Sequence, residues 1–127
     1  MIRIKHFLDG VEPDDGQRVW IEPIGCCKNL AEWCAIDHVL SNIGPPKKLW
    51  NWFQNHPDGY DRFRGEYHDF LSHVPYRNAL MELACIGKRE NFTLVHQGDN
   101  PCQNTASALA EFLVELEAYC PRDPEAS

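Results

Sequence analysis

One stretch, residues 92–113, constrains the fold more than any other part of the chain. Its first five residues, Phe-Thr-Leu-Val-His, are aromatic, β-branched or apolar on both faces, which is typical of a strand covered on both sides. Turn-forming residues follow at 98–101, after which Asn104 or Thr105 can cap a helix. The apolar residues of that helix recur at helical spacing: Ala106, Leu109, Ala110, Leu113 and Leu116. A strand that ends in a polar turn before a helix is where open α/β sheets bind ligands.

The remaining patterns predict one α/β domain over residues 1–120 and a polar C-terminal tail at residues 121–127. Short stretches at residues 2–8 and 18–24 are rich in β-branched and apolar residues and predict two more strands. A helix that begins after residue 29 would carry Val39 and Leu40 on its apolar face. The strongest helical periodicity lies in one later set: Tyr60, Phe63, Tyr67, Phe70 and Leu71.

The order of these elements predicts how the strands pair. Helices between the second and third strands supply the crossover that parallel pairing needs. We therefore expect a small, largely parallel sheet of about three strands, covered by about five helices.

Composition and charge exclude several classes of protein. The 12 basic and 19 acidic residues give a formal net charge of −7, which argues against binding to the nucleic-acid backbone. No apolar run approaches the roughly 20 residues of a membrane span, and the N-terminus lacks the apolar core of a signal peptide. We expect a cytoplasmic protein that binds neither nucleic acid nor membrane, with its oligomeric state left open.

The chain holds six cysteines, an unusually high number for a domain of 127 residues. In the absence of a signal peptide, reduced thiols are expected. Three of them fall within apolar helical patterns and are expected to pack as small buried side chains: Cys34, Cys85 and Cys120.

Several segments occur in the order and spacing of one known family. They include residues 1–5 (Met-Ile-Arg-Ile-Lys), residues 13–19 (Pro-Asp-Asp-Gly-Gln-Arg-Val) and residues 108–113 (Ala-Leu-Ala-Glu-Phe-Leu). On these segments the chain resembles the domain of unknown function 488 (YeaO-like) family, from residue 1 to about residue 115. The resemblance implies a small α/β protein without a generally established activity.

Two segments depart from the pattern of that family. After the second strand, members usually read Val-Asp-Arg-Leu-Trp-Pro-Arg-Gly, whereas residues 21–28 read Ile-Glu-Pro-Ile-Gly-Cys-Cys-Lys. In the turn after the last strand, members often carry Glu-His-Asn-His, whereas residues 102–105 read Cys-Gln-Asn-Thr. We therefore expect a divergent member whose site is altered.

The sharpest chemical hypothesis concerns thiols. If the second and third strands are parallel neighbours, their ends bring together Cys26, Cys27, His96 and Cys102, a donor set that suits zinc or iron. Alternatively, Cys26 or Cys27 is a catalytic nucleophile, because a helix N-terminus beside Lys28 favours the thiolate. A third interpretation is that these cysteines only pack beneath the turn.

A small-ligand site is the broader hypothesis. The candidate ligand-binding residues are Asp15, Arg18, Lys28, Gln103 and Asn104. Asp15 begins a tight turn, and Arg18 can pair with a carboxylate and hold that turn. We expect a small molecule or metal ion in the crevice between residues 24–29 and 96–104. The alternatives are a cysteine-dependent enzyme and a non-catalytic protein-interaction subunit.

Overall fold

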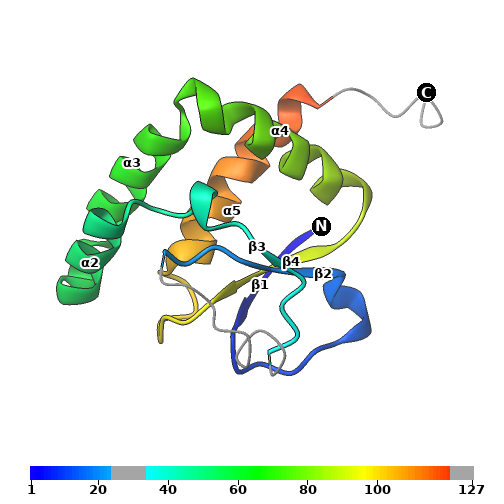
Figure 1. Ribbon diagram of the computed structural model, residues 1–127, viewed down its shortest axis with the longest axis horizontal. Helices are drawn as coiled ribbons and strands as arrows, with labels where there is room; N and C mark the ends of the chain where they lie inside the picture. The colour runs from blue at the N-terminus through cyan, green and yellow to red at the C-terminus, as the bar shows by residue number, and fades with distance from the viewer. Residues whose placement is uncertain (24–33, 121–127) are drawn as a thin grey trace.

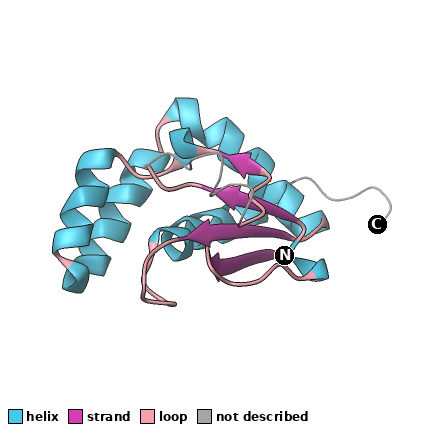
Figure 2. Ribbon diagram, turned by 60° about the horizontal axis from the view of Figure 1, so that its bottom comes forward, coloured by secondary structure: helices cyan, strands magenta, loops and turns pink. Residues whose placement is uncertain are grey.

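Four parallel strands form one sheet in the computed structural model, which describes residues 1–23 and 34–120 (Figures 1 and 2). The strands are β1 (Ile2–His6), β2 (Gln17–Trp20), β3 (His38–Val39) and β4 (Phe92–His96), in the spatial order β1-β4-β2-β3. Each neighbouring pair is parallel, which confirms the expected α/β class with a small parallel sheet.

β4 occupies the middle of this sheet. Its Leu94 pairs with Ile4 of β1 on one side and with Val19 of β2 on the other. All five residues of β4 are buried, as the lack of alternation in this stretch predicts.

Two short elements differ from the expected ones. β2 ends at Trp20, and β3 replaces the end of the helix that was expected to carry Val39. Val39 is instead 48% exposed at the edge of the sheet.

Helices cover one face of the sheet (Figures 1 and 2). The described residues contain four α-helices: α2 (Lys47–Asn55), α3 (Tyr60–Leu71), α4 (Val74–Arg89) and α5 (Thr105–Leu116). They also contain four short 3₁₀-helices: η1 (Pro13–Asp15), η2 (Ser41–Ile43), η3 (Pro57–Gly59) and η4 (Glu117–Tyr119).

The core lies between the sheet and these helices. Val19 and Leu94 point from the sheet into one apolar cluster with α3 and α5. On α3 the predicted periodic residues Phe63, Tyr67 and Leu71 are fully buried, because they share the helix face that packs into this apolar cluster.

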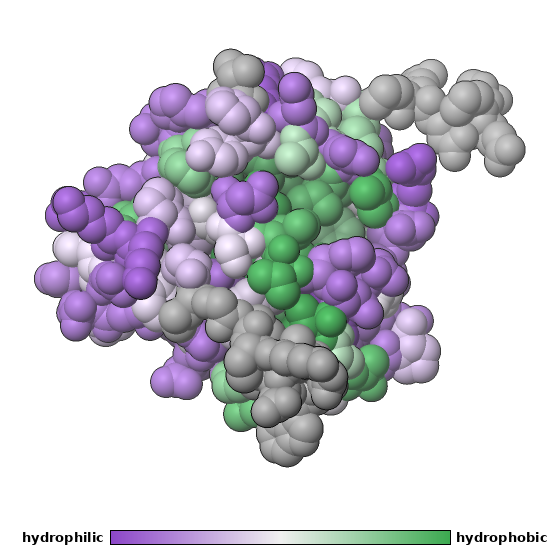
Figure 3. Space-filling view, in the orientation of Figure 1, coloured by the Kyte–Doolittle hydropathy of each residue, from purple (hydrophilic) through white to green (hydrophobic). Residues whose placement is uncertain are grey.

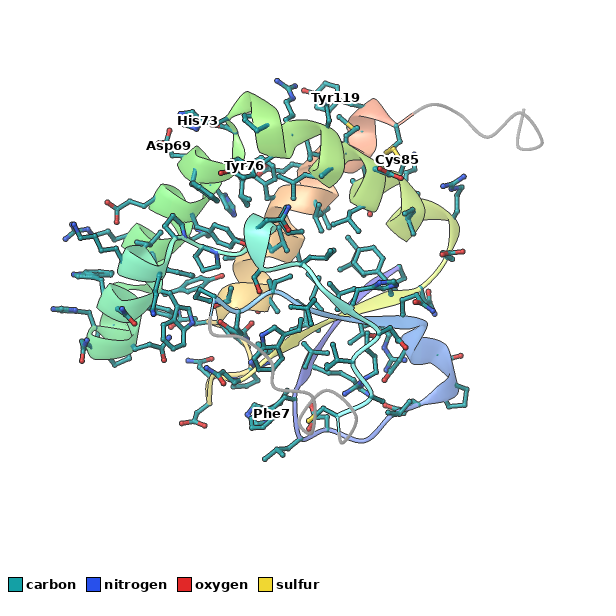
Figure 4. The ribbon with its side chains drawn as sticks, viewed as in Figure 1. Phe7, Asp69, His73, Tyr76, Cys85 and Tyr119 are labelled. Atoms are coloured by element: carbon teal, nitrogen blue, oxygen red, sulfur yellow. A yellow bond between two sulfur atoms is a disulfide. The ribbon has the colours of Figure 1, made fainter. Side chains whose placement is uncertain are left out.

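Loops cover the opposite face of the sheet. The side chains of Arg18 and Trp20 alternate with that of Val19 along β2, and all three are buried. Phe7 lies on this lower side (Figure 4), with its ring edge-on to Trp20 at a centroid distance of 6.5 Å. The Arg18 Nε donates to the Cys34 carbonyl at 3.0 Å, which holds the Cys34 backbone against β2.

Cys85 and Cys120 form a disulfide (Figure 4). The two Cα atoms lie 5.5 Å apart. The disulfide joins α4 to the residue that follows η4. The expectation of reduced thiols is therefore wrong for this pair. Cys85 lies on α4 and Cys120 directly follows η4, and these two elements meet in space, which a linear pattern does not reveal. Cys34 is free and buried, as expected, and Cys102 is free and exposed.

Apolar side chains gather at the surface over β3 and α4 (Figure 3). They line a groove of about 320 Å³, together with the exposed Glu82 and Glu90. The apolar lining residues are Val19, Leu40, Ile43, Ala79, Leu83, Ile86 and Phe92.

None of the helices within the described ranges is both long enough and apolar enough to cross a membrane.

Candidate functional site

A cavity of about 340 Å³ lies at the C-terminal ends of β2 and β4. Its volume falls within the range of small-molecule sites, about 300–1,000 Å³. The turn between β4 and α5 supplies most of the wall. The C-terminal end of α2 and single residues of η3, α5 and the segment after β2 complete it. The lining residues are Glu22, Phe53, Gln54, Pro57, Gln97, Gly98, Asp99, Asn100, Gln103, Asn104 and Thr105.

Two asparagines shape the turn. The Asn100 Oδ1 accepts hydrogen bonds from the backbone N–H groups of Cys102 and Gln103, at 2.9 and 3.0 Å. The Asn104 Nδ2 donates to the Asn100 carbonyl at 2.9 Å, and the Asn104 Oδ1 accepts from the Ser107 N–H at 2.8 Å. Asn104, rather than Thr105, is therefore the N-cap of α5.

Glu22 follows β2 at the base of the cavity and is 2% exposed. Its Oε2 accepts from the Trp50 Nε1 at 2.7 Å and from the Thr105 hydroxyl at 3.2 Å. Its Oε1 accepts a longer hydrogen bond, 3.4 Å, from the Gln97 N–H. Burial raises the pKa of the Glu22 carboxyl, although these three donors oppose the rise. Among the described residues, no lysine, arginine or histidine forms an ion pair with Glu22.

The hypotheses from sequence did not include Glu22. The available signal was its position, since Glu22 is the one charged residue in the otherwise apolar stretch at residues 19–24. Its burial depends on Trp50 and Thr105, which lie 28 and 83 residues further along the chain.

We expect Glu22→Gln to change how stability depends on pH. Because burial raises the folded pKa of Glu22 above its unfolded value, ionisation destabilises the native state relative to the unfolded state. As pH rises from the ordinary pKa of a glutamate, about 4.3, through the folded pKa of Glu22, the wild type should therefore lose stability relative to the variant. Urea unfolding at two pH values across that window measures the difference. The free energy of unfolding of the exposed control Glu115→Gln should vary with pH as that of the wild type does. A difference in free energy of unfolding between wild type and Glu22→Gln that does not vary with pH would contradict this prediction.

His96 ends β4 and is 3% exposed. Its Nδ1 has no hydrogen-bond partner among the described residues. Its ring meets that of His6 edge-on, with the centroids 5.5 Å apart. Burial lowers the pKa of His96, and the neighbouring His6 lowers it further. Gly98 lines the cavity and also lies beside the His96 ring: a Cβ added at Gly98 would be 3.9 Å from the His96 Nδ1.

The metal hypothesis gains no support from the described part of the chain. Within it, no three histidine, cysteine or acidic side chains converge as metal ligands would. His96 is buried, whereas Cys102 is exposed in a separate groove between α3 and α5. The other two predicted ligands, Cys26 and Cys27, lie outside the described residues.

The predicted ligand-binding residues fall in two places. Gln103 and Asn104 line the cavity. Their role in binding a ligand stays a prediction. Asp15 and Arg18 lie away from it, at the start of β2. Lys28 lies outside the described residues.

Asp15 and Arg18 form a buried ion pair, with 2.8 Å between the Arg18 Nη1 and the Asp15 Oδ2. The Lys5 Nζ approaches the Asp15 Oδ1 at 3.1 Å, and the Thr93 hydroxyl donates to the Asp15 carbonyl at 2.8 Å. Burial alone would raise the pKa of the Asp15 carboxyl, yet hydrogen bonds from Lys5, the Glu12 backbone and Arg18 hold it below its ordinary value. Arg18 therefore holds this turn, as the sequence predicts.

The whole chain, residues 1–127, matches the family model described as the inactive DUF488-N3 subclade. The chain belongs to the DUF488 family. This confirms the resemblance carried by residues 1–5, 13–19 and 108–113.

Two curated proteins similar to this DUF488 chain carry the name uncharacterized protein. The uncharacterized protein YeaO of Escherichia coli (strain K12) is 30% identical over 118 residues, which cover 91% of this chain and 98% of YeaO. An uncharacterized protein of Mycobacterium tuberculosis (strain H37Rv) is 28% identical over 118 residues, which cover 88% of this chain and 92% of the relative. No solved structure matches the chain.

Proposed function

We propose that this DUF488 protein is a non-catalytic protein that binds a small polar molecule in the cavity beside Glu22. One observation carries the proposal: a buried carboxylate lies at the base of a cavity of about 340 Å³ whose walls are rich in amide groups. The location supports it as well, because ligands of open α/β sheets bind beyond the carboxyl ends of the strands.

The side chains around the cavity suit recognition by hydrogen bonds. Gln54 and Gln103 are exposed, and Gln97 is half-buried, so their amides are accessible to a bound molecule. Each amide offers both a donor and an acceptor. Phe53 and Pro57 add apolar surface, which suits the carbon skeleton of a ligand.

Two observations favour binding over catalysis. The matching family model describes an inactive subclade. Among the described residues that line the cavity there is no cysteine, histidine, lysine or serine, four of the common nucleophiles and bases, and the groups of that kind that are present are Glu22, Asp99 and Thr105. The cysteine-dependent alternative rests on Cys26 and Cys27, which lie outside the described residues.

A role as an interaction subunit is the second candidate. The apolar groove between β3 and α4 favours it, because exposed apolar surface bordered by charged residues is typical of protein-binding sites (Figure 3).

Amide-detected NMR with a library of small polar fragments tests the first proposal. Fragments that bind should shift the backbone amides of Gly98, Asn100 and Gln103 together, because these residues form one wall of the cavity. Gln103→Ala should weaken binding about three- to tenfold through the loss of one hydrogen-bonding group. Asn78→Ala, an exposed amide on α4, should leave binding unchanged. Shifts that cluster elsewhere, or none with any fragment, would refute the proposal.

A further inference from the structure

Two carboxylates face the cavity and no described basic side chain balances them. Glu22 lies buried at its base, and Asp99 is exposed on its wall. The described residues that line the cavity include no lysine, arginine or histidine. The whole chain carries a net charge of −7, so the surrounding field is negative as well.

The hydrogen bonds of Glu22 leave one oxygen underused. Oε2 is held by Trp50 and by Thr105, at the N-terminal end of α5, whose helix dipole also favours a negative charge. Within the described ranges, Oε1 accepts only the 3.4 Å hydrogen bond from the Gln97 N–H, and a carboxylate oxygen can accept two.

A buried carboxylate without an opposite charge is unfavourable, because its lost hydration is not replaced by an ion pair. A ligand that brings a positive charge to Oε1 removes this disadvantage, whereas an anion adds repulsion from both carboxylates. The cavity therefore selects for charge as well as for shape.

We infer that the molecule bound in this cavity carries a cationic ammonium or guanidinium group, which forms an ion pair with the Glu22 carboxylate. This inference rests on the proposed binding function and specifies the chemical class of the ligand. The amides of Gln97 and Gln103 then contact the polar remainder of the ligand, and Phe53 contacts its carbon chain. Phosphates and carboxylates are disfavoured.

Four probes of similar length separate the charge classes. Putrescine carries two ammonium groups, agmatine carries a guanidinium and an ammonium, 1,4-butanediol is neutral and succinate is anionic. In calorimetric titrations of the full chain, putrescine or agmatine should bind at least about tenfold more tightly than 1,4-butanediol, and succinate should not bind. Amine affinity should fall several-fold as salt rises from about 20 to about 200 mM, because salt screens the attraction.

Charge-removing variants locate the effect. Glu22→Gln keeps the shape and one acceptor oxygen, and it should reduce the preference for the amines over 1,4-butanediol about tenfold or more. Asp99→Asn should weaken amine binding about two- to threefold, because Asp99 is exposed and solvent screens its charge. Glu115→Gln, an exposed acid outside the cavity, is the control and should have no effect.

The outcomes separate this inference from the proposed function. If neutral probes shift the amides of the 97–104 turn but amines bind no better, the cavity binds ligands and the inference about charge is wrong. If no probe of any charge binds, both are wrong. Should Glu22→Gln fail to fold, Asp99→Asn and the salt dependence still decide, because amine affinity unaffected by both would overturn the inference.

Discussion

Asp15→Ala is expected to lower the free energy of unfolding by about 3–5 kcal/mol, the usual effect of breaking a buried ion pair. The variant leaves the Arg18 guanidinium, which is 1% exposed, without a carboxylate partner among the described residues. It also removes an ionic partner of Lys5 and the hydrogen bond from the Glu12 N–H to the Asp15 carboxylate. Urea unfolding monitored by circular dichroism measures the change.

Two comparisons test the cause of this destabilisation. Asp14→Ala, at the exposed neighbouring position, should change stability by less than about 0.5 kcal/mol. The folded pKa of Asp15 is lowered, so its contribution is complete at neutral pH and is lost as pH falls through that folded pKa. The difference in free energy of unfolding between wild type and Asp15→Ala should therefore become smaller at acidic pH. A loss below about 1 kcal/mol at pH 7 would contradict a structural role for the pair.

Cys120→Ser is expected to destabilise the protein by about 3–4 kcal/mol, because its disulfide with Cys85 closes a loop across a sequence separation of 35. The principal effect lies in the unfolded chain, which gains conformational freedom when the loop opens. Cys102→Ser, at an exposed free cysteine, is the matched control and should leave stability unchanged.

Thermal unfolding with and without a thiol reductant gives an independent measurement. The reductant should bring the wild type to the melting temperature of Cys120→Ser and leave that of the variant unchanged. Equal melting temperatures for the oxidised and reduced wild type would show that the disulfide does not contribute to stability.

The elements best predicted from sequence are those whose own residues determine them. The β4–turn–α5 unit has a strand buried on both faces, turn-forming residues and the N-cap Asn104, and all three lie where the pattern indicates. The buried face of α3 follows for the same reason, since its apolar residues recur every three or four positions. In these two elements the local sequence pattern and the observed burial indicate the same structure, so the pattern alone is enough to predict it.

The features missed depend on partners that are distant in the chain. β3 has only two residues, too few to show the alternation of a strand, and its pairing with β2 defines it. The disulfide depends on how η4 returns to α4, and the cavity depends on Glu22, Trp50 and Thr105 meeting from three separate segments. A linear pattern gives the type of each residue and leaves its spatial neighbours open.

The central position of β4 has a consequence for the order in which the protein folds. β1 and β2 are synthesised long before residue 92, yet each pairs with β4, and neither pairs with the other. The growing chain therefore carries β1 and the β2–β3 pair without the strand that joins them until its final quarter emerges from the ribosome, after which the sheet can close. Pairings so distant in sequence form slowly, because each must bring together widely separated segments. We expect truncations before β4 to fail to fold and to aggregate through the unpaired edges of β1 and β2.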